Sequence, residues 1–519
     1  MAAEEGYDFV VVGAGSAGSV VAHRLASRTA ARVLLVEAGG PDLRPEIHDQ
    51  ALSGVLSLWG PGELDWGYAT EPQPGLGGRV VPIARGKVWG GSSSINAMLH
   101  VRGNRRDFER WAALGNEGWG YRDVLPYFRR SETFRGQASD YRGTEGPVSV
   151  LTHAEATPVS RALFAAGAEI GLRDGGAAFD YNAAEQEDTV FFYQSTKNPD
   201  LTRSSSATAY LHPALDLPNL TVRDRSLATR LTVAGGRVTG LAYVRDGRYE
   251  YARAEREVIV CAGAFESPHL LMLSGIGPAG QLRRHGIGVV ADLPAVGANL
   301  QDHMILPVAY LSTGFRDAEA TLIAETGFFV RTGDQAAEEP PGLQMNLGGL
   351  KFVPPDLDQD GPGFTFAPVI TQPRSTGSVR LTSGDPAERM AVDPGYLTDR
   401  ADVESFLEGV ETARALAASR AFEPFAKAEI APGPHARTRA ELIAYVRGYA
   451  GTLWHPVGTC RMGTGEDAVV DPRLRVRGVD GLRVADASVM PRIVAGNTNA
   501  ATLMIGEKAA DMVIADSGL

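Results

Sequence analysis

Residues 9–18 read Phe-Val-Val-Val-Gly-Ala-Gly-Ser-Ala-Gly, a short β-branched run followed at once by three closely spaced glycines. Apolar residues then recur at helical spacing from Val20 to Ala26. A second apolar run, Arg32–Val36, ends at the acidic residue Glu37. Strand, glycine turn, helix and strand in this order form a βαβ unit of the size that a parallel sheet requires. The N-terminus is therefore predicted to belong to an α/β fold.

The three glycines have a mechanical role in a nucleotide site. Gly13 permits a tight turn, Gly15 lets the backbone approach a pyrophosphate, and Gly18 lets the helix pack closely against the strand. A phosphate would then lie at the helix N-terminus, where unpaired N–H groups favour an anion. Glu37 ends the second strand at a position suited to bind ribose hydroxyls. The pattern predicts a dinucleotide site without distinguishing FAD from NAD; the alternative is a tight turn that binds no ligand.

Composition excludes several other classes of protein. The chain has 519 residues, 44% hydrophobic and 22% charged, which is typical of a globular protein. Its net charge of −12, without a block of basic residues, disfavours nucleic acid or an anionic membrane as partner. We expect no membrane span and no secretory signal. With only two cysteines, Cys261 and Cys460, no disulfide framework is expected, so a cytoplasmic location fits best.

The rest of the chain alternates β and α patterns. Gly- and Pro-rich sequence at 41–82 predicts loops with short elements. Strands are expected at 220–223 and 237–244, as a meander, and at 257–261 and 482–485. Alternation at 364–370 and 378–381 predicts antiparallel sheet. Helical periodicity marks 402–417, 439–449 and a final helix at about 500–515.

Several separated blocks resemble the signatures of the glucose–methanol–choline (GMC) oxidoreductase family. They follow the family's order along nearly the whole chain, and are Arg85–Asn96 (RGKVWGGSSSIN), Gly263–Gly277 (GAFESPHLLMLSGIG), His455–Thr459 (HPVGT), Asp471–Val476 (DPRLRV), Val484–Ser488 (VADAS) and Gly496–Ala500 (GNTNA). The resemblance implies an FAD-binding Rossmann-like α/β domain and a substrate domain built on antiparallel sheet with helices. The FAD domain is expected to comprise residues 1–150, 201–310 and 445–519, and the substrate domain residues 151–200 and 311–444.

The resemblance and the glycine turn together give a set of expected cofactor contacts. By resemblance, Asn96 to Leu99 run beside the flavin ring, Asp486 lies near the pyrophosphate and Val222 meets the adenine. The expected contacts are Gly13, Gly15, Ser16, Ala17, Gly18, Glu37, Ala38, Arg85, Gly90, Gly91, Ser92, Asn96, Ala97, Met98, Leu99, Val222, Ala262, Gly263, Trp454, Asp486, Ala487, Thr498 and Asn499. Some family members attach FAD covalently through a histidine at the position held here by Ile95, so non-covalent FAD is expected.

The chemical centre is expected at His455. Oxidation of an alcohol by hydride transfer to flavin N5 requires a base for the hydroxyl proton, and a neutral imidazole suits that task. His455 lies in the family's catalytic block. Its partner, His or Asn in the family, aligns with Asn497, with Asn499 as the second choice. An Asn amide donates to the developing alkoxide while His455 takes the proton.

The substrate is expected to be an alcohol, most plausibly a primary one. Family members specific for choline carry a carboxylate where this chain has Ile305, which counts against choline. Leu453, Trp454 and one face of Phe364/Phe366 suggest an apolar pocket, although core packing explains them equally well. Oxygen or another acceptor would reoxidise the flavin. The alternative function is an FAD-containing lyase that cleaves a cyanohydrin; no hydrolase elbow or metal motif is present.

Overall fold

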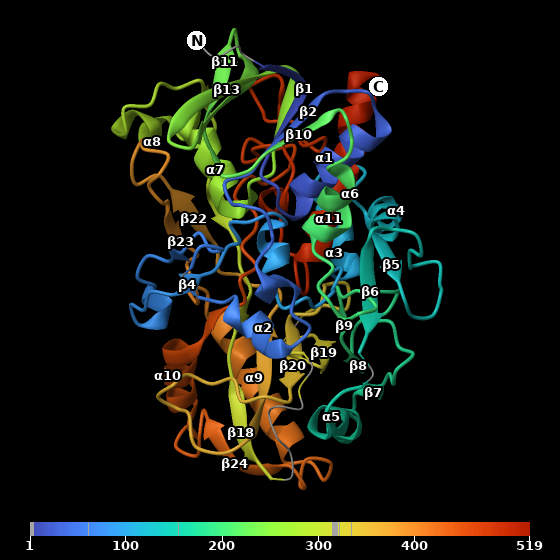
Figure 1. The fold of residues 1–519 in the computed structure, drawn as a ribbon. Helices are drawn as coiled ribbons and strands as arrows, with labels where there is room; N and C mark the ends of the chain where they lie inside the picture. Colours follow the sequence, from blue (N-terminus) through green and yellow to red (C-terminus); the bar gives the residue numbers. More distant parts are fainter. Residues whose placement is uncertain (1–4, 61, 154, 314–319, 321, 334) are drawn as a thin grey trace.

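The βαβ unit expected at the N-terminus is confirmed in the computed structural model, which describes residues 5–60, 62–153, 155–313, 320, 322–333 and 335–519 (Figure 1). Strand β1 (Glu5–Val12) leads into helix α1 (Ser16–Arg28), and β2 (Val33–Val36) returns parallel to β1. Residues 9–12 of β1 and all of β2 are buried on both faces, which explains their continuous apolar sequence.

The βαβ unit belongs to a seven-stranded mixed sheet. Its parallel part runs in the order β10 (Leu220–Arg223), β2, β1, β13 (Arg248–Val260) and β26 (Leu482–Val484). The first half of β13 also forms an antiparallel meander with β12 (Arg237–Arg245) and β11 (Ser226–Ala234). Segments far apart in sequence therefore build one nucleotide-type sheet, as the α/β prediction requires.

The sequence prediction for this meander was wrong in one respect. Residues 220–223 do not pair with 237–244; they form β10 and extend the parallel sheet beside β2. The meander partner is β11, which was not predicted. Only Asp224 and Arg225 separate β10 from β11, and Arg225 has φ of 46°, so the chain reverses within a run that reads as continuous β sequence.

A second, nine-stranded sheet lies at the opposite end of the molecule, at the bottom of Figure 1. Its main path is β24 (Ala426–Ala431), β18 (Val308–Ser312), β21 (Gly363–Ile370), β20 (Leu343–Gly348), β19 (Thr326–Val330), β8 (Thr189–Phe192) and β7 (Arg173–Asp174), with β17 (Met304–Ile305) and β25 (Gly451–Thr452) alongside. The pairs from β8 to β24 are antiparallel, as expected.

The two faces of this sheet have different roles. Helix α9 (Arg400–Ala417) packs on one face, where Phe364 and Phe366 join a core cluster with Met345. Because side chains alternate along a strand, Thr365 points the other way, toward a cavity. The interpretation of Phe364/Phe366 as core residues is therefore the correct one, and the pocket interpretation is wrong.

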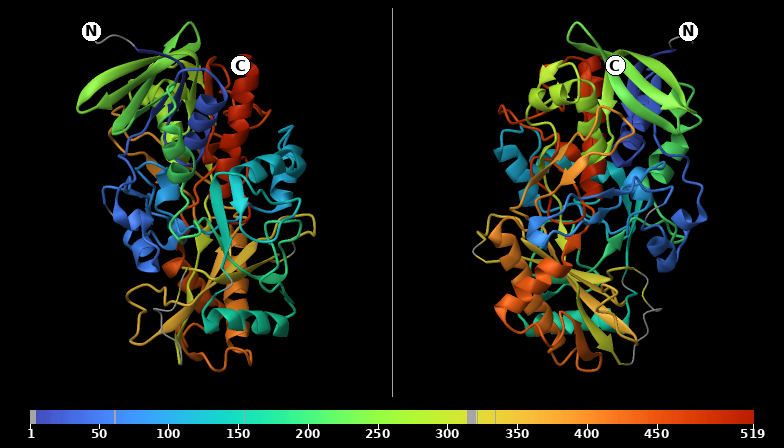
Figure 2. Two further views of the ribbon diagram at one scale, coloured as in Figure 1. Left: turned by 45° about the vertical axis from the view of Figure 1, so that its right-hand side comes forward. Right: turned by 90° about the vertical axis from the view of Figure 1, so that its left-hand side faces the viewer.

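The remaining elements connect the two sheets and surround them (Figure 2). Helices α1 and α11 (Asn499–Ser517) pack against each other, and both chain ends lie at the end with the seven-stranded sheet. Of the predicted strand 378–381, residues 378–380 fall in β22 (Gly377–Arg380), which belongs to a separate antiparallel sheet with β16 (Ala298–Leu300) and β23 (Ala391–Asp393). The domain boundaries stay a prediction.

The other helices and strands are as follows: η1 (Pro45–His48), α2 (Leu52–Ser57), β3 (Tyr68–Ala69), η2 (Pro74–Leu76), β4 (Pro82–Ile83), η3 (Gly91–Ser94), α3 (Arg105–Ala113), α4 (Tyr121–Ser131), β5 (Glu132–Phe134), β6 (Val148–Thr152), α5 (Pro158–Glu169), β9 (Gln194–Ser195), η4 (Ala207–Leu211), α6 (His212–Ala214), α7 (Gly263–Leu273), β14 (Ile276–Gly277), α8 (Ala279–Arg284), β15 (Ala291–Asp292), α10 (Arg439–Tyr449) and η6 (Ala487–Val489). Among the residues described, no helix combines the length and apolar character needed to cross a membrane.

Candidate active site

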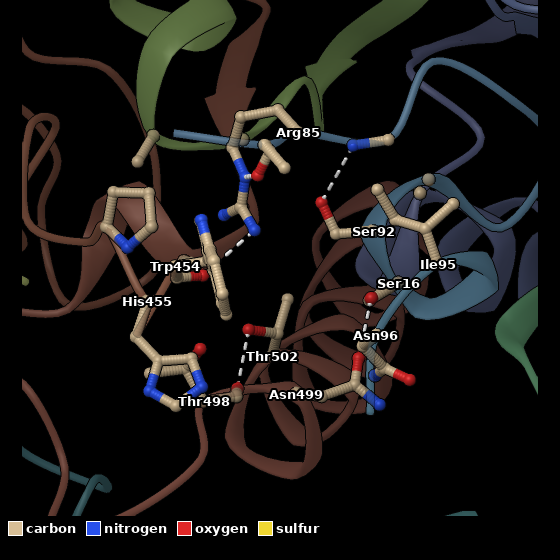
Figure 3. A pocket seen from close by; sticks show the side chains of 18 of the residues that line it. Ser16, Arg85, Ser92, Ile95, Asn96, Trp454, His455, Thr498, Asn499 and Thr502 are labelled. Carbon is tan, nitrogen blue, oxygen red and sulfur yellow. Dashed lines mark hydrogen bonds between the residues drawn. The ribbon is translucent and has the colours of Figure 1, made fainter. Parts of the chain in front are cut away.

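One long cavity collects most of the residues singled out in the sequence (Figure 3). Elements of both large sheets line it. The expected residues in its lining are Gly13, Gly15, Ser16, Ala17, Glu37, Ala38, Arg85, Gly91, Ser92, Asn96, Ala97, Met98, Leu99, Ala262, Gly263, Trp454, His455, Asp486, Ala487, Asn497, Thr498 and Asn499. Residues separated by hundreds of positions thus meet in one place.

Three expected residues lie outside this lining. Gly18 is packed under the turn, where an added Cβ would lie 1.8 Å from the Gly13 carbonyl oxygen. Gly90 is next to the lining residue Gly91 and donates its N–H to the Ala14 carbonyl. Val222, on β10, packs against the main core, and residues 226–228 of β11 line the cavity instead. The structure therefore does not bring Val222 to the cavity.

The close approach of two glycines forms the floor of the cavity. Gly91 has φ of 52°, and a Cβ there would lie 2.8 Å from the Cα of Gly15. The backbone of the Arg85–Asn96 block can therefore pack directly on the dinucleotide turn because Gly91 lacks a side chain. Helix α1 begins at Ser16, so its N-terminal N–H groups face this floor. Such a helix end favours a phosphate.

Glu37 is buried at the end of β2 and lines the same part of the cavity. One carboxylate oxygen accepts the N–H of Ala14 and the other accepts the N–H of Gly39, each at 2.7 Å. These bonds hold the carboxylate against the glycine turn. Each oxygen keeps a second lone pair for a ligand hydroxyl.

His455 is held in a defined tautomer by a second histidine. His303 lies within the core, and its Nε2 donates to the Thr371 carbonyl at 3.1 Å. Burial lowers the pKa of His303 to about 4, so its other nitrogen, Nδ1, carries a lone pair. His303 Nδ1 lies 2.9 Å from His455 Nδ1. Since His303 Nδ1 can only accept, the proton of this hydrogen bond is on His455 Nδ1. His455 Nε2 therefore carries the lone pair of the ring, on the side that meets Asn497 in the cavity.

The same surroundings keep His455 neutral. Burial is the main cause that lowers its pKa well below the usual value, and the neighbouring His303 and Arg85 add to the effect. A neutral imidazole is the form that accepts a proton. The His455 ring is thus both oriented and kept in its basic form at neutral pH.

The segment that carries His455 is clamped at three points. Trp454 has φ of 60°, a left-handed conformation that costs a non-glycine residue of order 1–3 kcal/mol. Its carbonyl accepts from Arg85 at 2.9 Å, and its N–H donates to Thr452. The His455 N–H donates to the buried Asp302 at 2.7 Å. These bonds offset the strain and fix the direction of the imidazole.

The two candidate partner asparagines have separate contacts. Asn497 Nδ2 lies 3.3 Å from His455 Nε2, while its Oδ1 is buried without a hydrogen-bond partner among the described residues. Asn499 begins α11 and accepts from the Ser16 hydroxyl at 2.7 Å, a bond drawn in Figure 3. The pairing of His455 with Asn497 fits this geometry, whereas Asn499 links α11 to α1.

The end of the cavity beside His455 has apolar walls. The Trp59 and Trp454 rings lie 5.1 Å apart, and Ile305 and Phe352 add further apolar surface. Other lining residues that the sequence did not single out are Trp66, Tyr68, Phe265, Glu266, His269, Ile323, Ala324, Asn346, Gly348, Leu350, Thr365, Ala367 and Thr502. They belong to loops, to strand faces and to helices α7 and α11, and no local pattern reveals which of their side chains face the cavity.

Acidic side chains in the lining belong to the nucleotide end. They are Glu37, Glu266 on α7 and Asp486 at the start of η6. Asp486 accepts from Gly263 and Ser267, and Glu266 contacts Tyr68 and His269. In the part of the nine-stranded sheet that lines the cavity, the described residues include no carboxylate. The described chain also contains no cluster of three or more His, Cys, Asp or Glu side chains suited to a metal ion.

Comparisons with known proteins agree on one family. Residues 7–305 and 373–506 match the two family models described as GMC oxidoreductase. An oxygen-dependent choline dehydrogenase of Sinorhizobium medicae is 41% identical over 98% of this chain and 95% of its own length. Pyridoxine 4-oxidase from Mesorbium loti superposes with a TM-score of 0.91 at 34% identity, covering 97% of this chain and 98% of its own. A formate oxidase variant of Aspergillus oryzae RIB40, studied for FAD modification, gives 0.90 at 27%, covering 99% of both chains.

Proposed function

Because the chain belongs to the GMC oxidoreductase family, and is therefore an FAD-dependent enzyme of alcohol oxidation, we propose that it oxidises an uncharged primary alcohol with His455 as the base. One observation carries the proposal: in a ring kept neutral by its surroundings, the His455 Nε2 lone pair lies in the cavity, 3.3 Å from Asn497 Nδ2. The first product is the aldehyde.

The cavity has the features that FAD requires. Gly15 and Gly91 provide a floor without side chains, the N-terminus of α1 suits the pyrophosphate, and Glu37 suits the ribose. The buried, unpartnered Oδ1 of Asn497 offers a further polar contact. When bound, FAD accepts the hydride from the alcohol carbon. Since Ile95 offers no nucleophile in the cavity lining, we propose that FAD is held without a covalent bond.

The protein's own groups would handle the proton. His455 Nε2 takes the hydroxyl proton of the alcohol, while His303 Nδ1 holds the opposite side of the imidazole. The Asn497 amide donates to the alcohol oxygen as negative charge develops there. The hydrogen bonds to residues 454–455 keep the His455 imidazole in place, so it needs little reorganisation during the reaction.

A test of this function must distinguish oxidation of an alcohol from cleavage of a cyanohydrin by a lyase. Purified protein, supplied with a soluble electron acceptor, should convert primary alcohols to aldehydes with one acceptor molecule reduced for each aldehyde formed. Acceptor reduction must depend on bound FAD. A protein that instead releases cyanide and aldehyde from a cyanohydrin, and reduces no acceptor with any alcohol, would be a lyase and the proposal would fall.

Choline is expected to be a poor substrate. The apolar walls around Ile305 lack a carboxylate among the described residues, so a quaternary ammonium would lose its hydration without a charged partner. We expect the uncharged carbon isostere of choline, in which carbon replaces nitrogen, to be oxidised with kcat/KM at least about tenfold higher. Steady-state kinetics with the two alcohols measures this ratio. Equal or greater efficiency with choline would mean that the aromatic side chains alone compensate the charge.

His303 should act as a positioning residue. In His303→Ala, His455 Nδ1 loses its acceptor, so we expect reduction of the flavin to slow roughly 10- to 100-fold. His303→Asn keeps an acceptor near that point and should recover most of the rate. Because His303 helps lower the pKa of His455, both variants should raise that pKa. The loss of rate on acidification should therefore begin at higher pH than in wild type.

Stopped-flow reduction across a pH series tests both expectations. Wild type should keep its rate at neutral pH and lose it only in acid, since the His455 pKa lies below its ordinary value. If alanine and asparagine slow the reaction equally and the pH profile stays unchanged, His303 serves only the packing of the core.

A further inference from the structure

Asn346 is a polar residue in the sheet wall of the cavity, which also contains Ile305, Gly348, Thr365 and Ala367. It lies on β20, opposite Ala367 of β21, and both residues line the cavity. Strand alternation places Gln344 and Asn346 on the same face, while Met345 between them enters the core under α9. The Asn346 amide therefore reaches the cavity from rigid, paired strand.

A chain of hydrogen bonds fixes the orientation of this amide. Gln344 Nε2 donates to the Tyr193 hydroxyl at 2.6 Å, and that hydroxyl donates to Asn346 Oδ1 at 2.5 Å. Burial raises the pKa of Tyr193 well above its ordinary value, so the phenol keeps its proton and remains a donor. Because Tyr193 occupies Oδ1, the Nδ2 group is the end of Asn346 left for a ligand.

The Nδ2 group has no hydrogen-bond partner among the described residues, although Asn346 is only 6% exposed. Its polar neighbour on the same wall is already engaged: the Thr365 hydroxyl donates to the Leu350 carbonyl and accepts the Phe352 N–H. The group opens into the cavity, so a ligand acceptor can pair with it there. Asn346 Nδ2 is therefore available to donate to a ligand, whereas the Thr365 hydroxyl proton is already used within the protein.

We propose that Asn346 Nδ2 selects alcohols that carry a second hydrogen-bond acceptor, such as a ring nitrogen or an ether oxygen, on an otherwise apolar and uncharged body. The apolar walls formed by Trp59, Trp454 and Phe352 suit the body. The Asn346 donor suits the acceptor, and the absence of a carboxylate from the described sheet wall disfavours a cation. The inference rests on the proposed function and narrows its substrate class.

The test compares benzyl alcohol with the three pyridinemethanol isomers, which have the same shape but add a ring nitrogen at different positions. At a pH where the pyridine is neutral, wild type should favour at least one isomer over benzyl alcohol by about five- to tenfold in kcat/KM, the usual effect of one neutral hydrogen bond. Asn346→Leu and the isosteric Asn346→Asp, which cannot donate, should abolish that preference. The readout in each variant is the ratio of kcat/KM between the favoured isomer and benzyl alcohol, so a general loss of activity does not alter it.

Binding provides a readout that does not depend on turnover. The corresponding aldehydes, benzaldehyde and the pyridinecarbaldehydes, can be titrated against the oxidised holoenzyme by the change in its visible spectrum. The favoured isomer should bind about five- to tenfold tighter than benzaldehyde in wild type and equally in both variants. Tyr193→Phe, which releases Asn346 Oδ1, should lose part of the preference.

Each contrary outcome has a separate meaning. If wild type prefers no isomer, or if the variants weaken benzene and pyridine ligands equally, Asn346 does not select the acceptor and the inference fails. If no alcohol reduces the flavin, the proposed function fails, whereas the aldehyde titrations still report on Asn346.

Discussion

Replacing His455 with alanine should slow reduction of bound FAD by a primary alcohol by about 10²–10⁴-fold, the usual contribution of a general base. The expectation follows from the geometry of the ring: its Nδ1 is held by His303, and its Nε2 lone pair faces the cavity beside Asn497. FAD content should not change, because the Glu37 and Gly15 contacts expected for FAD lie in other parts of the chain. Anaerobic stopped-flow spectroscopy measures the rate directly.

The matched control is His435→Ala, the same change at an exposed histidine outside the cavity lining. It should leave the rate within about twofold, as is usual for a surface substitution. Near wild-type reduction in His455→Ala would remove this residue from the mechanism. Loss of FAD from that variant would show that His455 supports the cofactor, and the rate would then have to be measured on reconstituted protein.

Glu37→Ala is expected to weaken FAD binding by about 10²-fold, since hydrogen bonds to a charged group contribute about 1.5–3 kcal/mol. The carboxylate would lose its ribose contacts and also its bonds to the N–H groups of Ala14 and Gly39. Titration of apoprotein with FAD, followed by flavin fluorescence, gives the dissociation constant. Once saturated with FAD, the variant should retain most of the wild-type reduction rate.

Two further variants show whether weaker FAD binding arises from the loss of the Glu37 oxygen acceptors. Glu37→Gln keeps one oxygen acceptor and should lie between alanine and wild type. Glu46→Ala removes an exposed carboxylate that pairs with Arg44 at the surface and should leave FAD binding unchanged. If Glu37→Ala binds FAD as tightly as wild type, the assignment of Glu37 to the ribose is wrong.

The sequence could predict features whose signal is local. Residues 9–37 show a strand, a glycine turn and an acidic residue in the order that the βαβ unit requires, and that unit is present. The block around His455 stands out among ten histidines through its neighbours in sequence. Local spacing thus predicted the fold class, and the resemblance of the motif blocks to the GMC family predicted FAD.

Features that arise from tertiary packing could not be predicted in the same way. His303 touches His455 across 152 positions, and only the fold brings the two rings together. The choice between Thr365 and Phe364 as the cavity face of β21 depends on where α9 packs, because both faces of this strand are buried. Val222 lies outside the cavity lining, where residues 226–228 are found instead, and the chain reversal at Arg225 that separates them leaves no strong signal in the sequence.

The central claim is tested most directly by the visible spectrum of purified protein before and after anaerobic addition of a panel of uncharged primary alcohols. The account predicts a yellow protein whose flavin band bleaches with at least one alcohol, forming one aldehyde for each FAD; readmitted air then separates an oxidase from a dehydrogenase. A yellow protein that no alcohol bleaches, or a colourless protein that cannot be reconstituted with FAD, would contradict it.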